Sequence, residues 1–191
     1  MRLILASTSP YRRQLLERLG LPFSVEGPGV EERHESRETP PQRAVRLAAA
    51  KAHAVGARYP DAVVIGSDQV ACAGESVLDK PGDAGHARAQ LSQLSGSSAI
   101  FYTACSVLCA SPAFSASHLD TTRVVFRPLS ASEIERYVAR ERPFDCAGAF
   151  KSEALGVSLL ERIDSVDPHS LIGLPLIWLA SILRELGFAV P

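Results

Sequence analysis

The stretch AVVIGSDQV, residues 62–70, indicates the fold and raises the first question about function. Its first four residues are an apolar run of the kind that forms a buried strand. A glycine follows, and Asp68 and Gln69 then stand side by side where the predicted strand ends. Ligands of α/β proteins bind at the carboxyl ends of strands, so polar side chains there are candidates for a site. A Gly-Ser-Asp sequence also forms turns, and both interpretations of Asp68 are open at this point.

Apolar strands and helical patterns alternate on both sides of this stretch. We predict strands at residues 3–6, 62–66, 77–79, 99–108, 121–129 and 157–163, and helices at residues 10–19, 40–58, 83–95, 130–140 and 170–187. Ser9 and Pro10 provide a cap and a first helical residue for the first helix, and Ser130 with Glu133 forms a capping box. Helices placed between strands predict an α/β fold.

Composition narrows the possible functions. The chain has 191 residues, of which 46% are hydrophobic and 21% charged, and we expect one compact globular unit with room for two lobes. A formal net charge of -1 argues against general affinity for nucleic-acid polymers or anionic membranes. No apolar run approaches the length of a membrane span, and no signal sequence opens the chain. The four cysteines lack paired CxxC spacing, and we expect reduced thiols in a cytoplasmic protein.

Lysine is rare in this chain. Lysine and arginine total 20, but lysine occurs only at Lys51, Lys80 and Lys151, which leaves 20 − 3 = 17 arginines. Where lysine is kept, a compact and flexible ammonium group suits the position better than a planar guanidinium. Lys51 shares the apolar face of its helix with Leu47 and Val55, so it either extends to the edge of that face or points a charge into a cleft.

The first strand, turn and helix form a predicted anion site. Ser7 ends an apolar run, and Arg12 and Arg13 lie in the first turn of the helix that follows. Free backbone N–H groups and the helix dipole favour an anion there, whereas two cations at this end are unfavourable for the helix itself. A bound phosphate removes that conflict.

The polar residues at the ends of predicted elements suit a polyphosphate with a divalent metal. Cations would neutralise phosphate charge, while carboxylates such as Asp68 and Glu32 would hold the metal or take a proton from water. The oxygen ligands favour Mg²⁺ or Mn²⁺. Glu32 alone is also typical of a solvated acidic loop. Motifs of serine hydrolases, phosphate-binding ATPases and dinucleotide dehydrogenases are absent.

Several ordered motifs together resemble the Maf-like family of nucleoside triphosphate pyrophosphatases. They are Ser7-Thr8-Ser9-Pro10-x-Arg12-Arg13, Lys51-Ala52, Gly66-Ser67-Asp68, Asp79-Lys80-Pro81, the Ala147-Gly148 to Lys151 segment, and Ile172-Gly173-Leu174-Pro175. The resemblance implies a single domain over residues 1–191, with an elongated mixed sheet flanked by helices and two lobes around a deep nucleotide-binding cleft. It also implies a cytoplasmic enzyme, often a homodimer, that hydrolyses a nucleoside triphosphate to the monophosphate and pyrophosphate.

The resemblance further implies a role for each matching residue. Asp68 would be the general base that activates water against the α-phosphorus, and Glu32 would lie beside the metal or the water. The phosphates would be bound by Ser7, Arg12, Arg13, Lys51, Lys80 and Lys151.

Three positions are similar to the 7-methyl-GTP pyrophosphatase subgroup of that family. Tyr11 stands where dTTP/UTP pyrophosphatases usually carry arginine, and Gln69 and Glu153 also differ from that pattern. The positive charge of 7-methylguanine favours an aromatic face, so Tyr11 is expected to stack on the base. Glu153 is expected to accept from guanine N–H groups, and Gln69 to donate to O6. Alternatives are hydrolysis of UTP, dTTP, GTP or another modified nucleotide, or a regulator of cell division that binds nucleotide without turnover.

Overall fold

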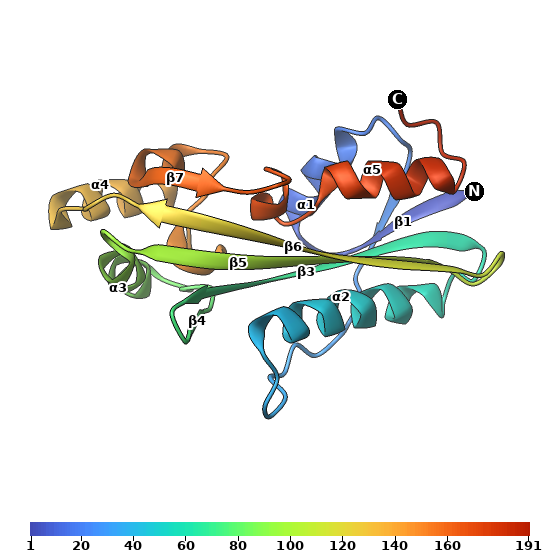
Figure 1. Ribbon diagram of the computed structural model, residues 1–191, viewed down its shortest axis with the longest axis horizontal. Coiled ribbons are helices and arrows are strands. Elements are labelled where there is room, and N and C mark those ends of the chain that lie inside the picture. Colours follow the sequence, from blue (N-terminus) through green and yellow to red (C-terminus); the bar gives the residue numbers. More distant parts are fainter. The chain divides into compact units, whose positions relative to one another are not determined.

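The computed structural model describes residues 1–191 and contains seven strands and five α-helices (Figure 1). The strands are β1 (Arg2–Ala6), β2 (Ser24–Glu26), β3 (Ala62–Ala73), β4 (Ser76–Leu78), β5 (Ser98–Cys109), β6 (Phe114–Phe126) and β7 (Leu160–Asp164). The helices are α1 (Pro10–Glu17), α2 (Pro40–Gly56), α3 (Ala84–Leu94), α4 (Ala131–Glu141) and α5 (Leu176–Glu185). Three short 3-10 helices are η1 (Ala147–Ala149), η2 (Leu155–Leu159) and η3 (Ser170–Ile172).

The strands form one mixed sheet in the order β2-β1-β3-β5-β6-β7, with β4 paired to β3. β1 runs parallel to both β2 and β3, whereas β4 is antiparallel to β3 and β7 is antiparallel to β6. The expected α/β class, a mixed sheet flanked by helices, is therefore confirmed.

β3 is longer than the sequence predicted. The prediction ended the strand at residue 66, but it continues to Ala73, so Asp68 and Gln69 lie inside it. The continuation pairs with β4 in a hairpin, in which Ala71 lies opposite Leu78. β1 ends at Ala6, opposite Gly66, so Asp68 stands on the part of β3 that extends past the end of β1. The rule that sites form at the carboxyl end of a strand thus applies to β1 and not to β3.

The chain divides into two compact units, and the expected single domain over residues 1–191 stays a prediction. Unit 1 comprises residues 1–69, 103–120 and 167–191, and unit 2 comprises residues 70–102 and 121–166. β3, β5 and β6 each contribute residues to both units.

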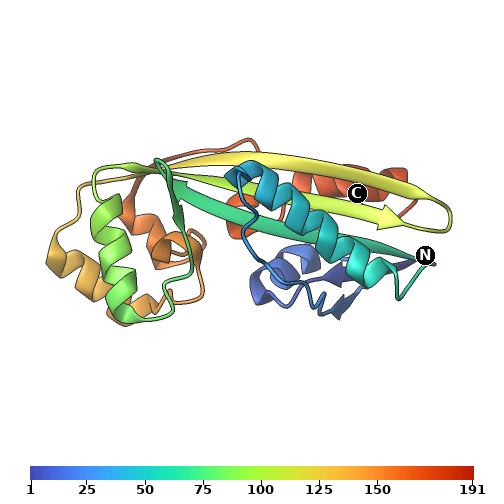
Figure 2. The same ribbon diagram turned by 90° about the horizontal axis from the view of Figure 1, so that it is seen from below.

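Unit 1 has an apolar layer on each face of the sheet. Leu3 and Leu5 pack with residues of α1 and α5, while the alternate residues Ile4 and Ala6 pack with residues of α2. This follows from the pleat, because successive side chains of a strand point to opposite faces. α2 and α5 consequently lie on opposite faces of the sheet (Figures 1 and 2).

Gly66 allows α2 to lie close against β3. A Cβ atom at this position would stand 2.3 Å from the carbonyl oxygen of Ala48 and 2.6 Å from the backbone nitrogen of Ala52. Both are backbone atoms of α2 and cannot move aside as a flexible side chain would. The glycine of the Gly-Ser-Asp motif is thus a packing requirement, and it lets Lys51 of α2 approach Asp68.

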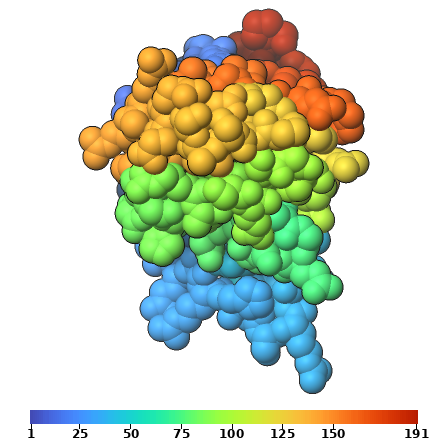
Figure 3. Space-filling view, turned by 90° about the vertical axis from the view of Figure 1, so that its left-hand side faces the viewer, coloured from blue at the N-terminus to red at the C-terminus, as the bar shows by residue number.

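Unit 2 packs α3 and α4 with the short helices. α3 contacts α4 and η1, and α4 contacts η2. Figure 3 faces this unit, with α3 in green beside α4 in gold. The ring of Phe150 lies edge-on to those of Phe101 and Phe126, with centroids 5.6 and 5.3 Å apart. This aromatic cluster anchors the segment that carries Lys151.

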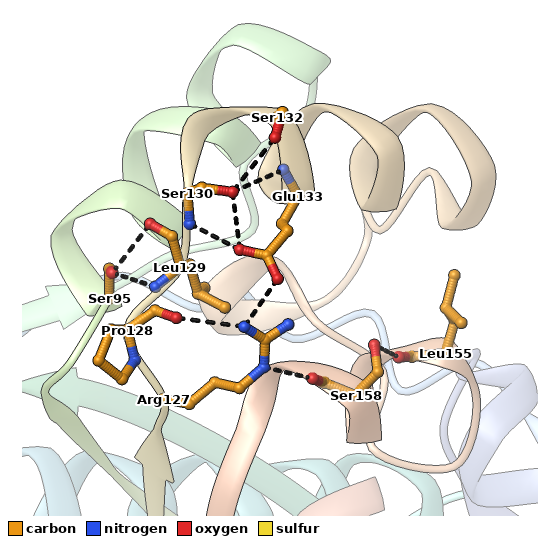
Figure 4. A network of polar contacts seen from close by, with 9 residues as sticks. All are labelled: Ser95, Arg127, Pro128, Leu129, Ser130, Ser132, Glu133, Leu155 and Ser158. Carbon is orange, nitrogen blue, oxygen red and sulfur yellow. Dashed lines mark hydrogen bonds and ion pairs between the residues drawn. The ribbon is translucent and has the colours of Figure 1, made fainter.

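A polar network links the end of β6 to α4 and η2 (Figure 4). The expected capping box is confirmed: Ser130 donates its backbone N–H to Glu133 and accepts from the Glu133 N–H. The other Glu133 oxygen lies 2.9 Å from the Arg127 guanidinium, whose Nε donates to the carbonyl of Ser158. The hydroxyl of Ser95, just past α3, accepts from the N–H of Leu129.

Other element boundaries differ from the predictions. β2 was not predicted, and β6 begins at Phe114 instead of residue 121. The strand predicted at 157–163 is a 3-10 helix followed by β7, and the predicted last helix divides into η3 and α5 around Gly173. None of the five helices has the length and apolar character needed to cross a bilayer.

Candidate active site

Asp68 is a buried carboxylate paired with a buried lysine. Its side chain and that of Lys51 are each only 7% exposed, and Lys51 Nζ lies 2.6 Å from Asp68 Oδ1. The expectation that Lys51 shares a face with Leu47 and Val55 is confirmed, since all three are buried on α2. Lys51 therefore points its charge inward and does not extend to the edge of the helix face.

Glu32 approaches the same ammonium group. Its carboxylate lies 2.5 Å from Lys51 Nζ, although its side chain is 55% exposed. Two arginines of α2 fix the loop around it: Arg43 donates to the carbonyl of Glu32 and Arg46 to the carbonyl of Arg33. The structure thus brings Glu32, Lys51 and Asp68 together from a loop, a helix and a strand.

Burial and charge act on the acid in opposite directions. Burial raises the pKa of Asp68, and the cations of Lys51 and Arg12 only partly oppose the increase. Burial also lowers the pKa of Arg12, which Asp68 and Glu32 oppose. A raised pKa brings a carboxylate closer to the value that suits a general base.

The turn before α1 has the geometry predicted from its serines. Ser9 caps the helix by accepting from the N–H of Arg12, and Pro10 is the first helical residue. Ser7 is buried and accepts from the N–H of Ser9 at 3.1 Å. No acidic residue occupies the first turn, so the positive end of the dipole is not offset by one.

The two arginines of α1 are used differently. Arg12 turns inward, and its Nε donates to the carbonyl of Gly173 at 2.9 Å. Arg13 is exposed and pairs with Glu17 one helical turn on. Gly173 has φ +125°, a backbone conformation that favours glycine, and a Cβ atom there would stand 3.3 Å from Arg12 Nε, a tight contact with the side chain that Gly173 holds.

Gln69 hydrogen-bonds within unit 1. Its Nε2 donates to Thr103 Oγ1 at 2.9 Å and to the carbonyls of Ser170 and Leu171 at 2.9 and 3.1 Å. The sequence led us to expect this amide group to donate to guanine O6. In the structure its N–H groups are engaged by protein oxygens, and the polar atom that remains is Oε1, an acceptor.

The other predicted residues lie as follows. Tyr11 is half-buried on α1 of unit 1, and Lys80 and Glu153 are exposed in unit 2. Lys151 of unit 2 lies 3.6 Å from a carboxylate oxygen of Glu141 and 3.4 Å from its carbonyl. Their roles toward a substrate stay predictions.

Three further residues, which had no predicted role of their own, shape the site. The Ser67 hydroxyl lies 2.8 Å from the carbonyls of both Ala104 and Gly173. Thr103 donates to the carbonyl of Ser170, and Asp167 accepts from His169 and Ile177. The contacts of Ser67 and Thr103 join segments 37 to 106 residues apart, beyond any local pattern, and the Gly66–Asp68 and Ile172–Pro175 motifs were the available signals.

A divalent metal fits the acidic pair. Glu32 and Asp68 converge on a point where the Lys51 ammonium lies, so both can face one cation. The chain has no group of three or more His, Cys, Asp or Glu side chains that could hold a metal by themselves. Mg²⁺ often uses one or two carboxylates together with substrate phosphates, and two oxygen ligands suit that mode.

Comparison with known proteins identifies the family. The family model described as Maf-like protein matches residues 2–186. The chain belongs to the Maf-like family. The predicted resemblance to this family is thereby confirmed.

Maf-like relatives match over nearly their whole length. A protein of Xanthomonas oryzae pv. oryzae (strain MAFF 311018) is 53% identical over 190 residues, covering 100% of this chain and 99% of the relative. One from Albidiferax ferrireducens is 50% identical over 189 residues, covering 99% and 95%. Both relatives are named 7-methyl-GTP pyrophosphatase.

Among solved structures, the Ham1 protein of Staphylococcus aureus shares the fold. It aligns with a TM-score of 0.54 at 12% identity, covering 97% of this chain and 99% of that one. At this identity the likeness concerns the fold alone.

Proposed function

We propose that this Maf-like protein is a nucleoside triphosphate pyrophosphatase whose preferred substrate is 7-methyl-GTP. The observation that carries the proposal is Asp68, a buried carboxylate held by Lys51 and facing the same point as Glu32. The names of relatives at 50% identity or more over nearly the full chain support both the reaction and the base.

The reaction begins with a water molecule beside Asp68. Asp68 takes a proton from this water while the water oxygen attacks the α-phosphorus. The bond between the α-phosphorus and the oxygen that links it to the β-phosphorus then breaks. The products are 7-methyl-GMP and pyrophosphate. Lys51 orients the carboxylate, and positioned general bases contribute about 10²- to 10⁴-fold to such rates.

Fixed positive charge stabilises the phosphates in the transition state. The positive end of the α1 dipole carries no acidic residue, and Ser7 and Arg12 lie beside it. Electrostatic stabilisation of this kind is the main contribution in phosphoryl transfer. The assignment of Arg13, Lys80 and Lys151 to the phosphates rests on the motif resemblance.

Glu32 and Asp68 would hold Mg²⁺ or Mn²⁺ together with substrate oxygens. When bound, the cation neutralises part of the phosphate charge. The ammonium of Lys51 then remains as a cation for the phosphates.

Base choice is assigned to Tyr11, Gln69 and Glu153. Stacking of a cationic base on the Tyr11 ring is worth roughly 1–2 kcal/mol when desolvated. Glu153 would accept from the guanine N–H groups and attract the positive base. Because the N–H groups of Gln69 are engaged by the protein, we assign its Oε1 to a guanine N–H instead of O6.

Substitution of Asp68 tests the mechanism. Asp68→Asn keeps the shape but removes the base, and we expect kcat for 7-methyl-GTP to fall about 100-fold or more. Asp61→Asn, the same change at an exposed position, is the control and retains wild-type turnover. Pyrophosphate release is the measurement, and near wild-type turnover by Asp68→Asn refutes the assigned base.

A comparison of substrates tests the base. We expect kcat/KM for 7-methyl-GTP to exceed those for GTP, UTP and dTTP with either metal. A preference for UTP contradicts the roles given to Tyr11 and Glu153 but keeps the reaction. Tight nucleotide binding without pyrophosphate release favours the regulatory alternative.

The cellular compartment and the oligomeric state of the enzyme are also proposals. The four cysteines are thiols outside any disulfide, as suits a reducing compartment, and we propose a cytoplasmic enzyme. A homodimer is proposed from the family resemblance.

A further inference from the structure

Asp167 is a buried acid to which sequence analysis assigned no function. It is 3% exposed, and both of its carboxylate oxygens are used. Oδ1 accepts from the backbone N–H of His169 at 2.9 Å and lies 2.8 Å from Nδ1 of the same residue. Oδ2 accepts from the backbone N–H of Ile177, in the first turn of α5, at 2.7 Å. Asp167 therefore holds both ends of the turn formed by residues 169–174.

This turn is compact and closed by its own backbone. The N–H groups of Ile172 and Gly173 both donate to the carbonyl of His169, at 3.0 and 3.2 Å. The N–H of Gly173 also donates to the carbonyl of Ser170, at 2.9 Å. The carbonyls of Ser170, Leu171 and Gly173 accept in addition from side chains elsewhere in unit 1.

Those three carbonyls bind the residues on both sides of Asp68. Gln69 donates to the carbonyls of Ser170 and Leu171, and the Ser67 hydroxyl lies 2.8 Å from that of Gly173. The same Gly173 carbonyl accepts from Arg12 Nε. The turn thus contacts both sequence neighbours of the proposed base and the inward-facing arginine.

Only a carboxylate at position 167 satisfies this arrangement. Asparagine has one acceptor oxygen, whereas Asp167 accepts on two. Removing an acceptor leaves a part-buried N–H of His169 or Ile177 without its partner, which favours movement of the turn. A shift of the turn would move Arg12 and Gln69 together.

We propose that Asp167 is a positioning residue that aligns Arg12 and Gln69 through the carbonyls of the 169–174 turn. This inference rests on the proposed function. Asp167 does not touch substrate in this account, and it affects both turnover and base choice because one turn holds both side chains.

Asp167→Asn tests the proposal. We expect kcat/KM for 7-methyl-GTP to fall about 10- to 100-fold, since small displacements far from the chemistry have effects of this size. We also expect the ratio of kcat/KM for 7-methyl-GTP over GTP to fall severalfold. The value of kcat/KM and the substrate ratio are both measured below the melting temperature of each variant, and circular dichroism confirms that the variant is folded.

Asp83→Asn is the matched control. Asp83 caps α3 in unit 2 and, like Asp167, accepts from a backbone N–H and contacts Nδ1 of the same histidine, here His86. We expect this variant to lose thermal stability while keeping the substrate ratio of the wild type. Thr103→Val provides a second test, because it removes the hydroxyl between Gln69 and Ser170 with little change of shape. It should also lower the ratio.

The outcomes separate the inference from the proposed function. A folded Asp167→Asn that keeps kcat/KM within twofold of the wild type overturns the inference. An equal fall in kcat/KM for 7-methyl-GTP and for GTP also overturns the inference, because general destabilisation of the protein has that effect. If Asp167→Asn does not fold, an unchanged ratio in Thr103→Val overturns it. A wild type inactive on every triphosphate instead contradicts the proposed function, and the inference with it.

Discussion

Lys51 lies between two acidic side chains, and its position combines opposing requirements. Burial of Asp68 disfavours its charged form, while the ammonium 2.6 Å away favours it. The exposed Glu32 shares the same cation. Burial therefore raises the pKa of this carboxylate, while the charges of Lys51 and Arg12 limit the increase.

Glu133 gives a prediction about stability and pH at the scale of one residue. The N–H and hydroxyl of Ser130 and the Arg127 guanidinium lower its pKa from 4.5 to about 2 (Figure 4). A lowered pKa in the folded state means that stability from Glu133 is full above about pH 4.5 and is lost as pH falls toward 2. We expect Glu133→Gln to lower the urea midpoint at pH 7.

The control for this prediction is the pH series itself. The difference in urea midpoint between wild type and Glu133→Gln should shrink from pH 5 to pH 2. A difference that stays constant over that range refutes the assignment of the shift to these contacts.

Gly66 connects the residue scale to the packing of α2 on β3. Gly66→Ala would place a methyl group against the backbone of Ala48 and Ala52. We expect the free energy of unfolding to fall by about 1–3 kcal/mol, the usual cost of overpacking a core. We also expect kcat to fall, because Lys51 moves away from Asp68. Gly27→Ala is the control, because its Cβ would meet only Thr8, at 3.7 Å. Equal stability and turnover in the two variants would contradict this account.

At the scale of elements, α2 also orders the acidic loop before it. Arg46 makes two hydrogen bonds to Glu38, at 2.6 and 2.8 Å, and one to the carbonyl of Arg33. The loop that carries Glu32 is thus tied to the helix that carries Lys51. Neither tie is visible in a local sequence pattern.

Arg46→Met is expected to release this loop. Trypsin should then cleave after Arg33 or Arg37 faster than in the wild type, and kcat/KM should fall about tenfold as Glu32 loses its position. Arg88→Met, which removes an exposed ion pair with Glu135, is the control and changes neither rate. Unchanged proteolysis in Arg46→Met shows that the loop does not depend on this arginine.

Elements with local signals were predicted well, and those with distant partners were not. The caps at Ser9 and Ser130 lie within three residues of the groups they bind, so the sequence shows them directly. The contacts of Gln69 depend on a turn 101 residues away, and β1 pairs with β3 across the intervening α1, β2 and α2. Such features arise from tertiary pairing, which no local window contains.

At the scale of the whole molecule, family membership and reaction came from many short motifs in order. Each motif alone had an ordinary structural explanation, as Gly66 and Ser9 show. Read together they predicted the family that the full-length match confirms. They did not predict the turn at residues 169–174, whose role depends on backbone carbonyls that carry no sequence signature.

The central claim is that water attacks the α-phosphorus under the action of Asp68. Hydrolysis of 7-methyl-GTP in ¹⁸O-labelled water, followed by mass spectrometry of both products, tests it directly. The account predicts one labelled oxygen in 7-methyl-GMP and none in pyrophosphate. Label in pyrophosphate, or release of orthophosphate in its place, would contradict it.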